Sequence, residues 1–132
     1  MRSDRNHPLR ILLAEDDPDV RAALRELLGL EGFTILEADD GLAALEIFRR
    51  ETLAFSIMDV DMPGMNGIEV LRIVRQQRGG FPCIFITGDD SRQRQIQARQ
   101  VGAFTLLAKP VAPDVLRFSV RRLVDTHYGK LG

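Results

Sequence analysis

The sequence contains few of the residues that crosslink a chain, bind zinc or cross a membrane. A single cysteine, Cys83, excludes an intramolecular disulfide, and its apolar neighbours predict a small core residue rather than a nucleophile. Histidine occurs only twice, so no cluster of histidine and cysteine competes with oxygen ligands for a metal. No apolar run approaches the roughly 20 residues of a membrane-spanning helix. We therefore expect any metal site to use oxygen ligands.

An excess of charge of one sign is also lacking. The net charge of -1 argues against a general nucleic-acid-binding domain, which is usually strongly basic. Residues 1–8 are polar and lack the apolar segment of a secretory signal. We therefore expect a cytoplasmic protein that contacts neither nucleic acid nor a membrane directly.

The length of 132 residues suits one domain. We expect that domain at residues 9–127, with an N-terminal tail at 1–8 and a C-terminal tail at 128–132. Apolar patterning predicts strands at 9–14, 33–37, 54–58, 81–87 and 103–108. Helices are expected at 18–31, after a cap at Asp39 or Asp40, from Asn66, at 91–101 and from Pro113. This regular alternation predicts an α/β fold, with a parallel sheet covered by helices on both faces.

The expected helix at residues 91–101 differs from the other four in its composition. It holds four glutamines and three arginines, with Ile96 and Val101 nearly its only large apolar residues. A helix so polar has little to anchor it to a core. Its arginines are expected to form either a solvated face or a docking site for a partner.

Polar side chains follow four of the five expected strands. These residues are Glu15 and Asp16 after the first strand, Asp59 after the third, Thr87 after the fourth and Lys109 after the fifth. Parallel strands place their carboxyl ends at one edge of the sheet, which is where open α/β sheets bind ligands. We therefore expect these side chains to converge there.

The chemistry of this set favours phosphoryl transfer. Clustered carboxylates repel one another, and a hard cation such as Mg²⁺ or Mn²⁺ relieves the repulsion. Lys109 can hold an anion, Thr87 can donate a hydrogen bond, and Asp59 can act as the nucleophile that forms an aspartyl phosphate. The alternative is a structural cluster of ion pairs between Lys109 and Asp16 or Asp59. That alternative does not explain why all the charges lie at the ligand-binding edge.

The same residues occur in four motifs: Glu15-Asp16-Asp17, Met58-Asp59-Val60 with Met62-Pro63-Gly64, Ile86-Thr87-Gly88, and Lys109-Pro110. In these motifs the chain resembles the receiver domains of two-component response regulators, over roughly residues 9–125. The resemblance implies a flavodoxin-like, doubly wound sheet of five strands in the order 2-1-3-4-5, with five helices. We expect a stand-alone receiver, as in chemotaxis-type or phosphorelay regulators, and a receiver cut from a larger protein would carry the same motifs.

The resemblance also assigns roles around the acceptor. Asp59 would take a phosphoryl group from a sensor histidine kinase or a histidine phosphotransfer protein. Asp16 and Asp59 would bind Mg²⁺ directly, Glu15 through water, and Asp61 through its backbone carbonyl.

Two further residues would respond to the new charge. Thr87 and Lys109 would contact the phosphoryl oxygens, and the peptide bond between Lys109 and Pro110 would be cis. The domain would be a signalling module rather than an enzyme, able to catalyse its own phosphorylation and dephosphorylation. Its output would be a surface that binds a downstream protein.

Three positions depart from the family pattern. Leu106 stands where an aromatic residue is usual, Asp89 where a small residue is preferred, and Asp61 adds a carboxylate near the mouth of the site. We expect these departures to bear on the switch mechanism and on the lifetime of the phosphoryl group, and not on the acceptor residues themselves.

Two other functions fit parts of the sequence. Asp59-Val60-Asp61 also resembles the nucleophile motif of haloacid-dehalogenase-type phosphohydrolases, but there the motif follows the first strand and a cap domain usually covers the site. A pseudo-receiver that binds partners without phosphorylation would not need the complete set of acids, threonine and lysine.

Overall fold

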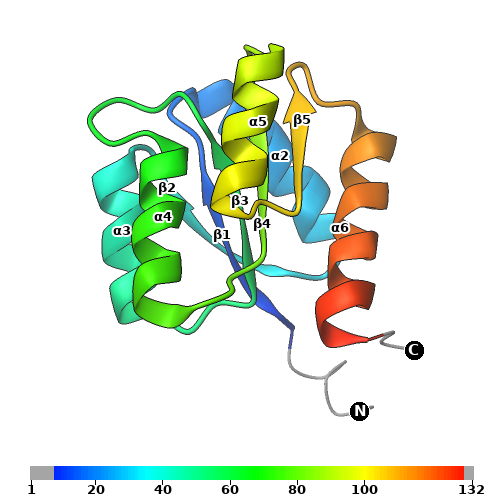
Figure 1. Ribbon diagram of the computed structural model, residues 1–132. Helices are drawn as coiled ribbons and strands as arrows, with labels where there is room; N and C mark the ends of the chain where they lie inside the picture. The colour runs from blue at the N-terminus through cyan, green and yellow to red at the C-terminus, as the bar shows by residue number, and fades with distance from the viewer. Residues whose placement is uncertain (1–7, 130–132) are drawn as a thin grey trace.

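Five parallel strands form one sheet between two layers of helices in the computed structural model, which describes residues 8–129 (Figure 1). The strands are β1 (Arg10–Ala14), β2 (Thr34–Ala38), β3 (Phe55–Asp59), β4 (Cys83–Thr87) and β5 (Thr105–Ala108). The helices are α2 (Pro18–Leu30), α3 (Gly41–Arg50), α4 (Gly67–Arg78), α5 (Arg92–Val101) and α6 (Pro113–Tyr128). The strand order is β2-β1-β3-β4-β5. The predicted α/β class and the strand order implied by the resemblance are both confirmed.

Alternating side chains divide the core into two layers. In β3, Phe55 and Ile57 pack toward α2 and α6, whereas Met58 packs toward α3, α4 and α5. Successive residues of a strand point to opposite faces, so a strand covered on both faces is buried along its whole length and is mostly apolar. All five residues of β3 and all five of β4 are buried, as this requires.

The predicted strands begin earlier than the observed ones. Phe33 and Phe81 precede the ladders of β2 and β4, yet each packs its ring edge-on against a core phenylalanine. Apolar patterning reports burial rather than backbone pairing, so it extended both strands. At the other end of the chain α6 continues to Tyr128, one residue beyond the predicted domain. The N-terminal tail predicted at 1–8 lies outside the described residues except for Pro8.

Side-chain caps fix the starts of α2, α3, α4 and α5 at the carboxyl edge of the sheet, whereas α6 begins without one. Asp17 caps α2, Asn66 caps α4 in a reciprocal capping box with Glu69, and Ser91 caps α5. Of the two acids considered for α3, the cap is Asp40. Each cap sets where a loop ends, and these loops carry the candidate site.

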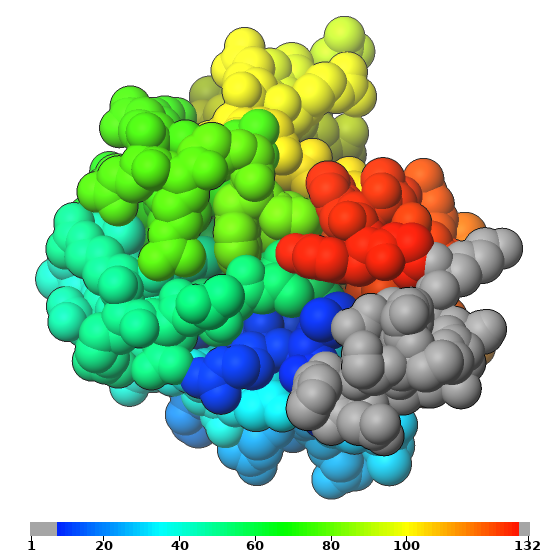
Figure 2. Space-filling view, turned by 90° about the horizontal axis from the view of Figure 1, so that it is seen from below, coloured from blue at the N-terminus to red at the C-terminus, as the bar shows by residue number. Residues whose placement is uncertain are grey.

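The opposite end of the sheet is closed by contacts between distant segments. Figure 2 views this end, with the start of β1 beside the end of α6. Arg10 pairs with Glu51, and the Tyr128 hydroxyl donates a hydrogen bond to the carbonyl of Ala54. None of the helices in the described part of the chain is long and apolar enough to span a bilayer.

Candidate functional site

Asp59 ends the central strand β3, where its carboxylate is 2% exposed. Its Oδ1 accepts a hydrogen bond of 3.0 Å from the Asp61 backbone N–H, and its Oδ2 accepts one of 2.9 Å from Lys109 Nζ. The following loop turns back tightly, since the Gly67 N–H donates to the carbonyl of Val60. A Cβ on Gly67 would lie 2.5 Å from the carbonyl oxygen of Asp59. Glycine is therefore needed where α4 begins beside the acid.

Three carboxylates converge at this point, as the strand ends predict. Glu15, Asp16 and Asp59 each offer one oxygen, and these oxygens all lie within 4.8 Å of one another. Glu15 is fully buried and accepts a 3.0 Å hydrogen bond from the Asp17 N–H, whereas Asp16 is exposed to solvent. The sequence placed both acids at the edge but did not distinguish their burial.

Lys109 joins two of the three acids. Its ammonium lies 2.8 Å from Glu15 Oε1 and 2.9 Å from Asp59 Oδ2. Burial raises the pKa of Glu15, an effect that Lys109 and the Asp17 N–H oppose. Burial alone would lower the pKa of Lys109, but its close contacts with the carboxylates of Glu15 and Asp59 outweigh burial and raise it. The ammonium therefore stays charged at neutral pH. Its peptide bond to Pro110 is cis, as the resemblance implies.

The cluster fits a hard divalent cation. Glu15 Oε1 is buried and makes an ion pair with Lys109, but no hydrogen bond of good geometry reaches it. One ammonium also leaves three carboxylates with an excess of negative charge. Oxygen ligands with this excess suit Mg²⁺ or Mn²⁺ better than zinc.

Thr87 reaches the same edge but does not hydrogen-bond with Asp59. Its Oγ1 lies 3.1 Å from Asp61 Oδ2 and 3.0 Å from the carbonyl of Asp89, and its hydrogen can be donated to either. The oxygen also accepts a 3.0 Å hydrogen bond from the Asp89 N–H. The hydroxyl is therefore engaged at the mouth of the site rather than beside the acid.

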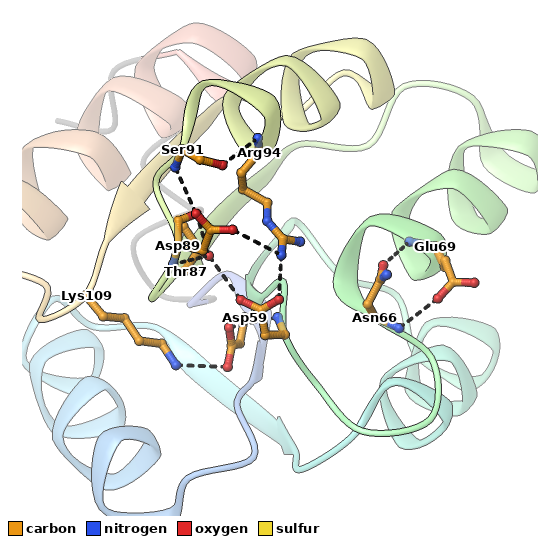
Figure 3. A network of polar contacts seen from close by, with 9 residues as sticks. Asp59, Asn66, Glu69, Thr87, Asp89, Ser91, Arg94 and Lys109 are labelled. Carbon is orange, nitrogen blue, oxygen red and sulfur yellow. Dashed lines mark hydrogen bonds and ion pairs between the residues drawn. The ribbon is translucent and has the colours of Figure 1, made fainter.

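Arg94, on the first turn of α5, is a member of the site that the sequence analysis missed. Its Nη2 lies 2.8 Å from Asp61 Oδ1 and 3.8 Å from Asp89 Oδ2 (Figure 3). Figure 3 shows Lys109 and Arg94 reaching toward the end of β3 from different sides. A usable signal was present, because Arg94 lies three residues after the cap Ser91, and side chains at the start of a helix lean back over the preceding loop.

Asp89 is held in its ionised form at the same mouth. Hydrogen bonds from Ser91 chiefly lower the pKa of Asp89, and the charge of Arg94 adds to the effect. Arg94 thus bridges the two acids at the mouth and partly neutralises their charge.

Comparison with known proteins agrees with this geometry. The sequence pattern of the response regulator receiver domain matches residues 11–121. This chain belongs to the response regulator receiver domain family. Among curated relatives, it is 35% identical over 116 residues to the C4-dicarboxylate transport transcriptional regulatory protein DctD of Pseudomonas aeruginosa, covering 88% of this chain and 25% of DctD. It is 34% identical to the response regulator MprA of Mycobacterium leprae, covering 88% of this chain and 51% of MprA.

Solved receiver structures share the fold. A CheY-like response regulator receiver domain protein from Methanospirillum hungatei superimposes with a TM-score of 0.86 at 26% identity, over 91% of this chain and 96% of that one. The Vibrio cholerae chemotaxis protein CheY4 gives a TM-score of 0.82 at 28% identity, over 88% and 98%. The chain is therefore a receiver domain of two-component signalling. Neither the phosphohydrolase nor the pseudo-receiver alternative is favoured, and Asp59 follows the third strand rather than the first.

Proposed function

We propose that Asp59 is the phosphoacceptor of this receiver domain and that a sensor histidine kinase or a histidine phosphotransfer protein is its donor. One observation carries the proposal: Asp59 is buried at the end of β3, with Lys109 on one oxygen and two further acids within metal-binding distance. A carboxylate built only for structure would not need two like charges beside it.

Asp16, Asp59 and the backbone carbonyl of Asp61 would hold Mg²⁺, with Glu15 acting through water. The exposed position of Asp16 and the buried position of Glu15 support this division of roles. When bound, the ion neutralises charge on the transferring phosphoryl group. Mn²⁺ would suit the same ligands.

This chain's own residues then direct the transfer. A carboxylate oxygen of Asp59 forms a new bond to phosphorus while the donor's N–P bond breaks, and the bonding electron pair returns to the donor's imidazole. Lys109 already contacts Asp59 Oδ2, so its ammonium can follow the charge from the carboxylate to the phosphoryl oxygens.

Thr87 would complete the response. Its hydroxyl can leave Asp61 and Asp89 and donate to a phosphoryl oxygen, since the new group brings strong acceptor oxygens and nearly two negative charges at pH 7. That movement would carry the loop before α5 with it and change a protein-binding surface. The domain thus works as a signalling switch rather than as an enzyme with multiple turnover.

The chain spans about a quarter of the length of DctD and half of that of MprA. Because the match covers only this part of each relative, a downstream contact is proposed from the receiver's own surface alone. We propose that its output is a contact with a protein target.

Label transfer from purified histidine kinases tests the acceptor. The wild type should gain a phosphoryl group that is stable to acid and labile to base, as an acyl phosphate is. The Asp59→Asn variant should lose all labelling, and Asp61→Asn is the matched control that keeps it. If Asp61→Asn abolished labelling and Asp59→Asn did not, the acceptor would be Asp61 and not Asp59. Repeated turnover of a small phosphate ester would favour the phosphohydrolase.

A further inference from the structure

Arg94 is more deeply buried than the acids that it binds. Its side chain is 18% exposed, compared with 48% for Asp61 and 56% for Asp89. An arginine on a solvated face would show the reverse. The side chain lies in the mouth of the site, although the polar composition of α5 predicted a solvated or docking face for it.

Asp61 connects Arg94 to the acceptor. Its backbone N–H donates to Asp59 Oδ1, and its carboxylate oxygens divide between two partners. Oδ1 accepts from Arg94 and Oδ2 accepts from Thr87. The position of this one carboxylate therefore influences how much negative charge a phosphoryl donor meets and whether the hydroxyl of Thr87 donates to it or to the carbonyl of Asp89.

We propose that Arg94 is a positioning residue for phosphorylation, which acts by neutralising Asp61 and holding it against Thr87. Without Arg94, Asp61 would present an uncompensated charge beside Asp59 and repel an anionic donor at close range. The proposal rests on the proposed function of Asp59 as acceptor. It makes Arg94 a determinant of which donors react well, since the penalty grows with the donor's charge.

The other arginines of α5 do not share this position. Arg92 and Arg99 are exposed and form no ion pair within the described part of the chain. Arg99 lies in the last turn of the helix, away from the loop that carries Asp89. Arg99→Gln therefore removes the same charge from the same helix without touching Asp61, and it serves as the matched control.

The test compares small-molecule donors at low salt with excess Mg²⁺. Arg94→Gln should slow labelling by acetyl phosphate about fivefold, the effect of roughly 1 kcal/mol of uncompensated charge. It should slow labelling by the less negative phosphoramidate by a smaller factor, and added salt should reduce both effects. Arg94→Lys should recover most of the rate, and Arg99→Gln should match the wild type.

The double variant Asp61→Asn/Arg94→Gln separates the mechanisms. If Arg94 acts through Asp61, the double variant should label as fast as Asp61→Asn alone. A double variant as slow as Arg94→Gln would mean that Arg94 contacts the donor directly, which overturns the proposal. An unchanged rate in Arg94→Gln, or an equal loss in Arg99→Gln, would overturn it too.

A measurement without donor or metal gives a second readout. Arg94→Gln should move the amide signals of Asp61 and Thr87 while the β-strand signals stay in place, which also confirms folding. Unmoved signals at both positions would contradict the positioning role. Failure of the wild type to label at Asp59 would instead refute the proposed function, so the two failures are distinguishable.

Discussion

The proposed acceptor site has a floor and a mouth that are held together in different ways. The floor consists of Glu15, Asp59 and Lys109, where both carboxylates are buried. The mouth consists of Asp61, Asp89 and Arg94, where both carboxylates are about half exposed. Charges with little water nearby interact strongly and are costly to separate, whereas exposed pairs contribute little to stability. The floor should therefore govern stability and chemistry, and the mouth should govern access and switching.

The helices beside the site repeat this difference. Helix α4 buries five residues and begins with a capping box, whereas α5 buries only Ala98. Leu106, on the strand beside α5, lines a groove with Gln95, Ala98 and Arg99 and offers no aromatic ring to move. We expect α4 to stay in place and α5 to move when the site is activated.

The largest expected effect is on the floor. Lys109→Met should lower the free energy of unfolding by about 2 kcal/mol at pH 7, because it leaves two buried carboxylates unpaired while some water still reaches the pair. Arg94→Met should cost less than about 1 kcal/mol. Urea unfolding of both variants measures the difference, and equal losses would remove the distinction between floor and mouth.

The pH dependence of the Lys109 contribution has a defined sign. The pKa of Lys109 is raised above 10.5 in the folded protein, so the stability that it adds is complete below 10.5. That stability is lost as the pH rises through the higher folded value. The gap between the wild type and Lys109→Met should therefore close only in strong alkali.

A smaller effect of opposite sign is expected at the exposed acid of the cluster. Asp16→Asn removes repulsion toward Glu15 and Asp59 and should raise the free energy of unfolding by roughly 0.5–1 kcal/mol. The same variant should lose the Mg²⁺ response that millimolar Mg²⁺ produces in the amide signals near Asp16 and Asp59 of the wild type. Destabilisation by this substitution would show that Asp16 makes a favourable contact in the free protein.

The difference between the two helices can be tested with beryllofluoride, which mimics the phosphoryl group. Hydrogen exchange between Thr87 and Gly102 should change by about fivefold, since weakly anchored segments shift at low cost. Amides of α4 (Gly67–Arg78) are the internal control and should change little. Changes confined to Asp59 and its own loop would mean that activation does not pass through α5.

The smallest expected effect concerns Asp89. Asp89→Ala removes an exposed charge that Arg94 approaches only to 3.8 Å, so acetyl phosphate should label the variant about twofold faster than the wild type. Asp90→Ala removes the neighbouring charge and is the control. An acceleration as large from Asp90→Ala would indicate a general charge effect rather than a feature of the mouth.

The sequence by itself was sufficient for the fold class and for bringing Asp59 and Lys109 to one edge of the sheet. Alternating strands and helices imply parallel strands, and parallel strands must end at one edge. Asp59 and Lys109 could therefore be placed together although 50 residues separate them in the chain. The helix start at Asn66 was also predicted from the sequence, because asparagine is a favoured N-cap residue, and the structure confirms it.

Only the tertiary structure decided the arrangement of the mouth and which of the two neighbouring acids, Glu15 or Asp16, is buried in the floor. The burial of Glu15 against the exposure of Asp16, the partner of the Thr87 hydroxyl and the reach of Arg94 all depend on how α5 and the loops are rotated against the sheet. Neither strand polarity nor hydrophobic period specifies that rotation, because long polar side chains can settle on either side of a helix at little cost. From the sequence, Arg94 could therefore be interpreted as a solvated residue. Only the packing of α5 places it against Asp61.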